Sequence, residues 1–321
     1  MTLRTYLRFD MRAPDFGPPA EALYAAALDM ADYADRHGFH GVMLSEHHGS
    51  DDGYLPSPMT LMAAIAGRTQ SLRLAFRALV APLHDPLRLA EDLAVLDQIS
   101  GGRVVAALAG GFIPAEFAMF DKDMGRRASL VEEAILTLKA AWAGEPFAFR
   151  GRTVRVTPRP LQRPHPPLLM GGSSPAAARR AARLADGFVT HLPDLYQIYY
   201  DQAAALDRNP APFSRVSPSF VHVAEDPQAA WRVIAPHALY EMNAYGRWHE
   251  AAGYKGGYKT VGSVEALKAS GAYAVITPED CIRMAGAVDE LIFHPLMGGL
   301  PPSLGWKSLE LFVEKVLPAL D

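Results

Sequence analysis

The sequence predicts a parallel α/β fold, a (β/α)8 TIM barrel with insertions, on three observations. Strand-like and helix-like segments alternate along all 321 residues. The strand-like segments are short apolar runs such as VVAALA at 104–109, which suit strands buried on both faces of a parallel sheet. No G-x-G-x-x-G follows the first strand, so a doubly wound open sheet is the less favoured alternative.

Eight strands can be placed in order along the chain. In the first half we expect strands at 3–9, 39–48, 72–82 and 104–109, and helices at 21–38, 58–69, 86–99 and 129–142. A small polar hairpin at 147–156, turning at Gly151, and a proline-rich connection at 157–167 follow.

In the second half we expect strands at 166–172, 188–193, 217–226 and 289–296, a helix at 174–187 and a closing segment at 305–320. Residues 227–286 are expected to hold several helices and a Gly/Tyr/Lys-rich loop at 253–262. The sequence contains no internal repeat and no linker that would separate domains. Residues 1–321 are therefore expected to form one domain.

The segment 82–112 contains one complete strand–helix–strand unit. Asp85 followed by Pro86 predicts a helix start, because Asp accepts from free backbone amides and Pro has no amide to leave unpaired. Asp97 falls outside the apolar stripe of this helix, and Gly101 can adopt the left-handed conformation that ends a helix. The stripe consists of Leu89, Leu93, Leu96 and Ile99.

Composition excludes several classes of protein. Half of the residues are hydrophobic and 21% are charged, so a large core is available and global disorder is excluded. The net charge of −4, without a basic block, argues against nucleic acid as a partner. Cys281 is the only cysteine, so no internal disulfide can form, which favours a reducing compartment.

We expect neither a targeting segment nor a membrane-spanning segment in this sequence. Its first 19 residues contain charges and prolines before a signal-peptide apolar region could form. No run approaches the roughly 18 apolar residues that a membrane helix needs. We expect a soluble, cytoplasmic protein that does not act at a membrane.

Polar residues after the second strand are the first candidates for chemistry. Glu46, His47 and His48 follow that strand, at the end of a barrel where active sites lie. Neighbouring side chains on an extended segment point in opposite directions, so at most one of the two histidines faces the barrel mouth. Such a histidine can move protons near neutral pH. From the residues alone, a pair of loop histidines bonded to backbone carbonyls is equally compatible.

The turn after the fifth strand is a candidate anion site. Gly171, Gly172 and Ser173 precede a helix that Ser174 caps, with Pro175 in its first position. The amides of Ala176 and Ala177 would be left unpaired at the positive end of this helix, where phosphate binds readily. An ordinary capped helix is the alternative reading.

A metal-dependent hydrolase is the rival barrel enzyme, and the sequence does not favour it. His84, His165, His191 and His294 lie near strand ends, but strand one ends in Phe9-Asp10-Met11 rather than H-x-H. No ligands are spaced for a metal cage, so no metal site is expected. The methionines near the strands are interpreted as packing rather than soft-metal ligands: Met43, Met59, Met62 and Met170.

Three strings together resemble the bacterial luciferase-like, flavin-dependent monooxygenase family. They are LSEHH at 44–48, AEDLAVLDQISGGR at 90–103 and SLELFVEKVLP at 308–318. The resemblance covers most of the chain, from Gly38 to Pro318, and is loose over 205–275. It implies that His47 is the active-site base near the flavin. The implied cofactor-binding residues are Phe76, Arg77, Gly110, Gly111, Arg127, Met170, Gly171, Gly172 and Ser173.

The sequence departs from the family at the expected cofactor site. Members of the family often have an arginine where Gly110 stands, and the phosphate-contacting arginine of the next loop aligns with Ala128, beside Arg127. Small residues, often joined by a non-proline cis peptide, are usual where Phe76 and Arg77 stand. Arg77 is expected to supply the positive charge that positions 110 and 128 lack, with a salt bridge to a carboxylate such as Glu46 as the alternative.

The resemblance implies an oxidoreductase that uses reduced FMN and O2 on a small organic substrate. A separate flavin reductase would supply the reduced FMN, since no dinucleotide fingerprint is present. The alternatives are hydride transfer with the 5-deazaflavin coenzyme, which shares the barrel and the anion site, and a non-catalytic subunit. We also expect a homodimer, with the alanine-rich helical segments 59–66 and 87–99 as candidate interface elements.

Overall fold

The computed structural model describes residues 3–254 and 258–320, which separate into two compact units. The first unit comprises residues 1–43, 48–56 and 214–321, and the second comprises residues 44–47 and 57–213. Part of the predicted loop at 253–262, residues 255–257, lies outside the described residues.

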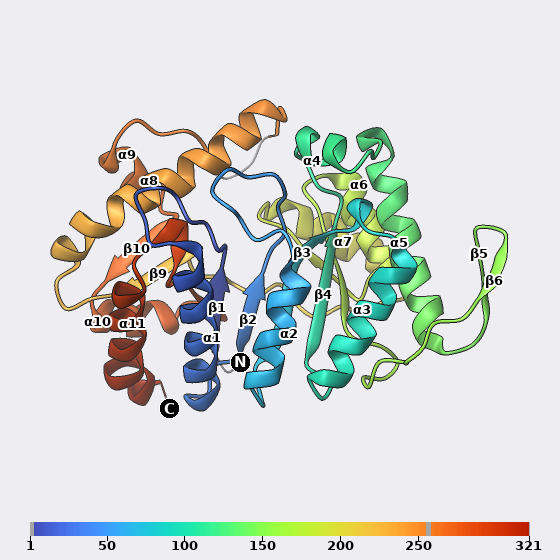
Figure 1. The fold of residues 1–321 in the computed structure, drawn as a ribbon, viewed down its shortest axis with the longest axis horizontal. Helices are drawn as coiled ribbons and strands as arrows, with labels where there is room; N and C mark the ends of the chain where they lie inside the picture. The colour runs from blue at the N-terminus through green and yellow to red at the C-terminus, as the bar shows by residue number, and fades with distance from the viewer. Residues whose placement is uncertain (1–2, 255–257, 321) are drawn as a thin grey trace. The chain divides into compact units, whose positions relative to one another are not determined.

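The first unit is a parallel sheet with helices, drawn in blue and in orange to red in Figure 1. Its strand order is β10-β9-β11-β1-β2. Strand β11 pairs in parallel with β1 and β9, and β9 pairs in parallel with β10. The strands are β1 (Arg4–Phe9), β2 (Gly41–Leu44), β9 (Phe220–Val223), β10 (Tyr273–Ile276) and β11 (Glu290–Phe293). The helices are α1 (Ala20–Arg36), α8 (Pro227–Ala251), α9 (Val264–Ala269), α10 (Pro278–Ala285) and α11 (Pro302–Leu311), followed by a π-turn at Phe312–Val316.

The second unit repeats the strand–helix alternation with the order β3-β4-β7-β8, all paired in parallel. Helix α3, strand β4 and helix α5 lie side by side in it (Figure 1). The strands are β3 (Arg73–Val80), β4 (Val104–Ala109), β7 (Leu168–Gly171) and β8 (Gly187–Val189), and the antiparallel hairpin is β5 (Phe147–Phe149) with β6 (Arg152–Val154). The helices are α2 (Pro58–Arg68), α3 (Pro86–Ile99), α4 (Pro114–Met119), α5 (Arg127–Ala143), α6 (Pro175–Leu184) and α7 (Asp194–Ala204).

The α/β fold class is confirmed, and each of the eight predicted strands has a counterpart. The hairpin predicted at 147–156 is present, with left-handed backbone at Arg150 and Gly151. Strand β10 was not predicted, because residues 227–286 were expected to form helices and a loop. It is only four residues long, between Gly271 and the helix start at Thr277–Pro278, which is too short for a clear alternating pattern.

One prediction for the helix at 86–99 is wrong, and one polar residue of this helix has an unexpected role. Asp97, which lies outside the predicted apolar stripe, is fully buried, and it accepts hydrogen bonds from the amides of Leu161 and Gln162 and from the Gln162 side chain. These hydrogen bonds join the proline-rich connection at 157–167 to α3. Ile99, placed in the apolar stripe, is 53% exposed, because it lies one turn after the exposed Val95 on the outer side of the helix, whereas Leu96 and Asp97 of the same turn are buried. The predicted cap is present: the Asp85 carboxylate accepts from the amides of Leu87 and Arg88.

Candidate active site

His47, which follows β2, is held by a buried carboxylate. Its Nδ1 lies 2.9 Å from Oε1 of Glu116, a residue of α4 that is only 1% exposed. Because a carboxylate accepts hydrogen bonds, Nδ1 is assigned as the donor in this pair. The ring of Phe112 stands edge-on to His47, with centroids 5.8 Å apart. Sequence reasoning missed Glu116, because α4 was not predicted and the pair spans 69 positions.

Glu46 is fixed by different partners from those of His47. Its carboxylate accepts from the backbone amide of Val80 at 2.6 Å and lies 2.8 Å from Nε2 of His84. Burial lowers the pKa of His84, but the hydrogen bond and charge of Glu46 raise it more, so the net pKa is raised. Glu46 therefore fastens its own segment, residues 44–47, to the end of β3, and His84 belongs to this structural group.

The end of β3 carries the non-proline cis peptide that the resemblance implies. It joins Arg77 to Ala78, one residue after the predicted Phe76–Arg77 bond, where the register with β4 shifts. The hydroxyl of Ser45 donates to the carbonyl of Arg77. Phe76 is fully buried, so its ring is part of the core, whereas Arg77 is half-buried.

Gly110 and Arg127 lie against each other. A Cβ added at Gly110 would meet Cγ and Cδ of Arg127 at 3.7 and 3.8 Å, so the aliphatic part of Arg127 covers this glycine. Arg127 is the first residue of α5, and Ala128 follows it on the exposed side. Gly111 has a φ of +68°, and a Cβ there would come within 2.8 Å of Val80, so only glycine fits. The side chain of Arg127 therefore lies beside Gly110, the position at which members of the family often carry an arginine.

The turn from β7 into α6 is arranged as predicted, except for the hydrogen bonding of one backbone amide. Ser174 caps α6, but its hydroxyl accepts from the amide of Ala177 at 3.2 Å, so this amide is paired, contrary to prediction. The amide of Gly172 donates to the carbonyl of Val189 at 3.1 Å. A Cβ at Gly172 would clash with that of Ala177, so glycine lets the helix start close to the strand. Ser173 is half-buried and Met170 is 2% exposed.

All the predicted site residues lie in the second unit. His47 and Phe112 are in ring contact, Gly110 and Arg127 are in side-chain contact, and Gly171 adjoins Ala109 at the end of β4. Of the four methionines interpreted as packing, Met43, Met62 and Met170 are buried and Met59 is half-buried.

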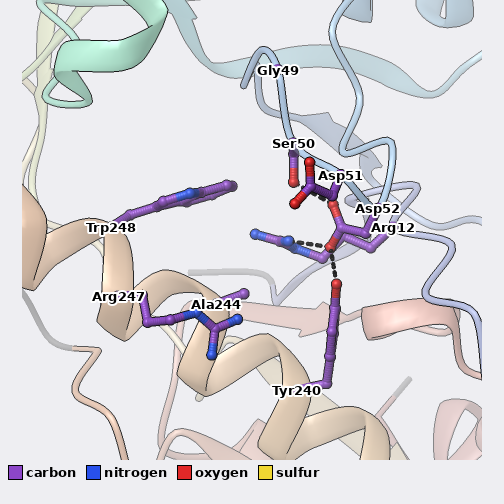
Figure 2. Close-up of a pocket in the computed structure, with 9 residues that line it drawn as sticks. All are labelled: Arg12, Gly49, Ser50, Asp51, Asp52, Tyr240, Ala244, Arg247 and Trp248. Carbon is purple, nitrogen blue, oxygen red and sulfur yellow. Dashed lines mark hydrogen bonds and ion pairs between the residues drawn. The ribbon is translucent and has the colours of Figure 1, made fainter.

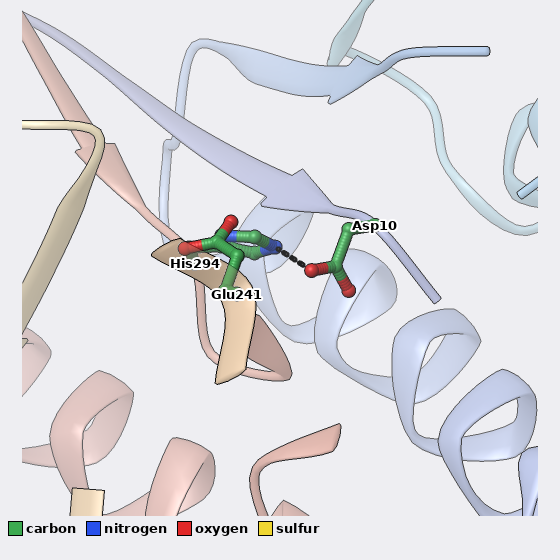
Figure 3. A group of neighbouring side chains, drawn as sticks. All are labelled: Asp10, Glu241 and His294. Carbon is green, nitrogen blue, oxygen red and sulfur yellow. Dashed lines mark ion pairs between the residues drawn. The ribbon is translucent and has the colours of Figure 1, made fainter. Parts of the chain in front are cut away.

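The first unit holds a group that the sequence analysis did not find. His294 lies between two carboxylates, with Nε2 3.6 Å from Asp10 and Nδ1 3.7 Å from Glu241 (Figure 3). All three side chains are buried and could in principle hold a metal ion. Arg12 and Arg8 lie within 3.9 Å of the same carboxylates, and an added cation would have to compete with both. Burial raises the pKa of Asp10, but His294 and Arg12 lower it further, so this carboxylate is already matched by positive charge.

Among the residues that the structure describes, none of the helices is long and apolar enough to cross a membrane.

Known proteins similar to this chain point to one family. The family model for luciferase-like monooxygenases matches residues 8–283. The chain is 31% identical over 174 residues to the FMNH2-dependent dimethylsulfone monooxygenase of Pseudomonas putida, covering 50% of this chain and 47% of that protein. It is 30% identical over 206 residues to the F420-dependent glucose-6-phosphate dehydrogenase of Nakamurella multipartita, covering 59% and 58%.

The similarity extends to a solved structure. The crystal structure of the monooxygenase RslO1 from Streptomyces bottropensis matches with a TM-score of 0.79 at 27% identity, covering 99% of this chain and 100% of that one. By contrast, the chain spans about half the length of the curated relatives it matches.

Proposed function

Because the chain belongs to the luciferase-like monooxygenase family, we propose that it is a flavin-dependent monooxygenase that uses reduced FMN and O2 on a small organic substrate. The observation that carries this proposal is the buried pair of His47 and Glu116. His47 stands where the family has its active-site base, and Glu116 fixes its ring. Reduced FMN, when bound, supplies the electrons that activate O2.

In this proposal His47 holds and moves the proton of the reaction. Glu116 accepts a hydrogen bond from Nδ1, and Nε2 is the atom proposed to exchange a proton with the reacting groups. The edge of Phe112 packs against the ring and helps to exclude water from it. Glu116 does not touch the reacting atoms in this account and is a positioning residue.

The residues around the strand ends fit a phosphorylated cofactor. The N-terminus of α6, with Gly172 and Ser173 in front of it, offers the positive end of a helix. Arg127 lies beside Gly110 at the N-terminus of α5 and replaces the positive charge that Gly110 and Ala128 do not provide. Arg77, next to the cis peptide, is a second candidate for this charge. The remaining cofactor contacts are proposed for Phe76, Gly111, Met170 and Gly171.

A separate flavin reductase is the proposed partner, since the curated dimethylsulfone monooxygenase is described as FMNH2-dependent and this chain has no dinucleotide fingerprint.

A second candidate function is hydride transfer with the 5-deazaflavin coenzyme. It is favoured by the F420-dependent dehydrogenase relative, which aligns over 206 residues. A phosphate site at α6 would serve both cofactors, so the geometry alone does not favour either.

An anaerobic titration distinguishes these candidates. The protein is titrated with FMN, reduced FMN and the deazaflavin coenzyme, each followed by its own absorbance or fluorescence. We expect reduced FMN to bind most tightly. Tighter binding of the deazaflavin coenzyme would transfer the proposal to the second candidate, and binding of none of the three would support a non-catalytic subunit.

A further inference from the structure

A polar pocket in the first unit is not used by the proposed flavin site. It is formed by Arg12 after β1, by the segment Gly49–Asp52 after β2, and by one face of α8 (Figure 2). That face carries Tyr240, Ala244, Arg247 and Trp248, which are spaced as neighbours on one side of a helix. The cavity volume is about 170 Å³, below the range of roughly 300–1,000 Å³ typical of drug-sized ligands, so it suits a small molecule.

Arg12 is a buried positive charge with unused hydrogen-bond donors. It is 1% exposed, and its Nη1 donates to Asp52. Its Nε and Nη2 have no hydrogen-bond acceptor among the described residues. The guanidinium instead lies over the rings of Trp248, Tyr54 and Tyr245, at 4.6, 4.8 and 5.2 Å from their centroids. Burial lowers the pKa of Arg12, but Tyr245, Asp52 and Asp10 raise it more, so the charge is permanent.

The carboxylate of Asp52 takes part in hydrogen bonds within the wall of the pocket. It accepts from Arg12, from the hydroxyl of Ser50 and, at 2.9 Å, from the hydroxyl of Tyr240. Burial and Asp52 raise the pKa of Tyr240 to about 12, which keeps this hydroxyl protonated as a donor. Since both hydroxyl hydrogens point to Asp52, the oxygens of Ser50 and Tyr240 are left as acceptors for a ligand.

Two charges on the rim of the pocket are unmatched. Arg247 and Asp51 are both exposed, and neither makes an ion pair or side-chain hydrogen bond with any other described residue. The half-buried ring of Trp248 lies beside Arg247 on α8 (Figure 2). The pocket thus combines a cation, an anion, acceptor oxygens and an aromatic wall.

We propose that this pocket binds a small zwitterion, with its carboxylate toward Arg247 and Arg12, its ammonium toward Asp51 and the Ser50 and Tyr240 oxygens, and its apolar part on Trp248. A zwitterion can form charge-assisted hydrogen bonds with both the arginines and Asp51. A simple anion would be repelled by Asp51, and a simple cation would be repelled by the two arginines. That this zwitterion is the substrate of the oxygenase rests on the proposed function, but its binding does not.

The test measures binding without flavin. Phenylalanine carries both an ammonium and a carboxylate group, whereas 3-phenylpropanoate lacks the ammonium group and phenethylammonium lacks the carboxylate. All three share the phenyl group, and their dissociation constants are measured by equilibrium dialysis. We expect phenylalanine to bind about 10-fold or more tightly than either analogue, on the order of one charge-assisted hydrogen bond. Equal binding of the three, or tightest binding of one analogue, would overturn the proposal.

Two variants assign the two ends of the ligand. Arg247→Met should weaken the binding of phenylalanine and 3-phenylpropanoate about 10-fold, and should not weaken the binding of phenethylammonium, which loses a repelling charge. Asp51→Asn should weaken the binding of phenylalanine and phenethylammonium, and should not weaken the binding of 3-phenylpropanoate, which also loses a repelling charge. Both positions are exposed, so folding is not at risk. Arg232→Met, an exposed position of α8 outside the pocket, is the matched control. Loss in the control equal to that in Arg247→Met would contradict the assignment.

The outcome is separable from that of the proposed function. Flavin binding is measured by the anaerobic titration and does not involve Arg247 or Asp51. Zwitterion binding without flavin binding would reject the oxygenase proposal only, and flavin binding without selectivity among the three phenyl probes would reject the zwitterion pocket only.

Discussion

His47 is oriented by a residue that lies far away in the chain. From the residues alone, two neighbouring histidines, His47 and His48, are candidates for proton transfer. In the structure, the hydrogen-bond partner of His47 supports its assignment to this role. His47 has the buried Glu116 carboxylate at Nδ1, an arrangement that selects one tautomer and holds one ring position. Such an arrangement is what a proton-transfer group needs, because the transfer depends on a fixed distance to the reacting atoms.

His222 should make the protein sensitive to mild acid. It is 4% exposed in β9, and burial lowers its pKa to about 4 from the ordinary 6.5. Between these two values the unfolded chain binds a proton that the folded chain does not, so the free energy of unfolding falls as the pH falls. The loss reaches about 3.5 kcal/mol at most, at roughly 1.4 kcal/mol per pKa unit.

Urea unfolding of the wild type and of His222→Gln at about pH 7 and about pH 5 tests this contribution. The variant should lose less stability than the wild type on acidification, since it has no imidazole to protonate. Equal losses in the two proteins would mean that another group carries the acid sensitivity.

Residues whose roles depend on local sequence could be predicted, and residues whose roles depend on distant partners could not. The cap at Asp85 and the glycine at 111 follow from helix and turn rules. The burial of Asp97 could not be predicted, because its partners at 161–162 come close to it only in the folded chain. Glu116 and Arg12 were missed for the same reason.

The string AEDLAVLDQISGGR, which carries most of the resemblance, has a structural role at its end. Gly101 and Gly102 have φ values of +66° and +86° and turn the chain out of α3. Arg103 is 8% exposed and donates to the carbonyls of Ala66, Thr69, Leu72 and Ser100. It therefore joins the ends of α2 and α3 to the start of β3, at a distance from any chemistry.

The start of α6 is the element on which phosphate selectivity should depend. Gly172→Ala would bring a Cβ against Ala177 and displace the first turn of the helix. FMN should then bind about 10- to 100-fold more weakly, as expected for one or two lost charge-assisted hydrogen bonds, while riboflavin, which lacks the phosphate, is nearly unchanged. Fluorescence titration of both flavins measures the difference.

The control for this variant is Gly67→Ala in α2, where an added Cβ meets nothing within 4 Å. Equal losses of FMN and riboflavin in Gly172→Ala would place the phosphate elsewhere.

At the scale of elements, most strands could be read from the sequence because each is a short apolar run between turn residues. Three elements outside this pattern were not predicted. Strand β10 and helix α4 have four and six residues, too few for a periodic pattern, and their conformations depend on pairing and packing with distant segments. Helix α7, with 11 residues, was also not predicted.

For the whole molecule, we propose self-association through the outer surface of the second unit. Val95 and Ile99 of α3 and Leu136 of α5 are 42%, 53% and 51% exposed, and α3 packs beside α5. Sedimentation over a wide concentration range should give a dimer mass, and Ile99→Lys combined with Val95→Lys should shift it toward the monomer. A monomer mass for the wild type at all concentrations would reject this proposal.

The central claim is that a flavin reacts with O2 under the control of His47. It is tested most directly by stopped-flow reoxidation of reduced FMN bound to the wild type, His47→Ala and His48→Ala, at matched cofactor occupancy. We predict that His47→Ala changes the rate by about 10²–10⁴-fold, the usual contribution of a general acid or base, and that His48→Ala changes it far less. A wild-type rate in His47→Ala, or a larger effect in His48→Ala, would contradict the account.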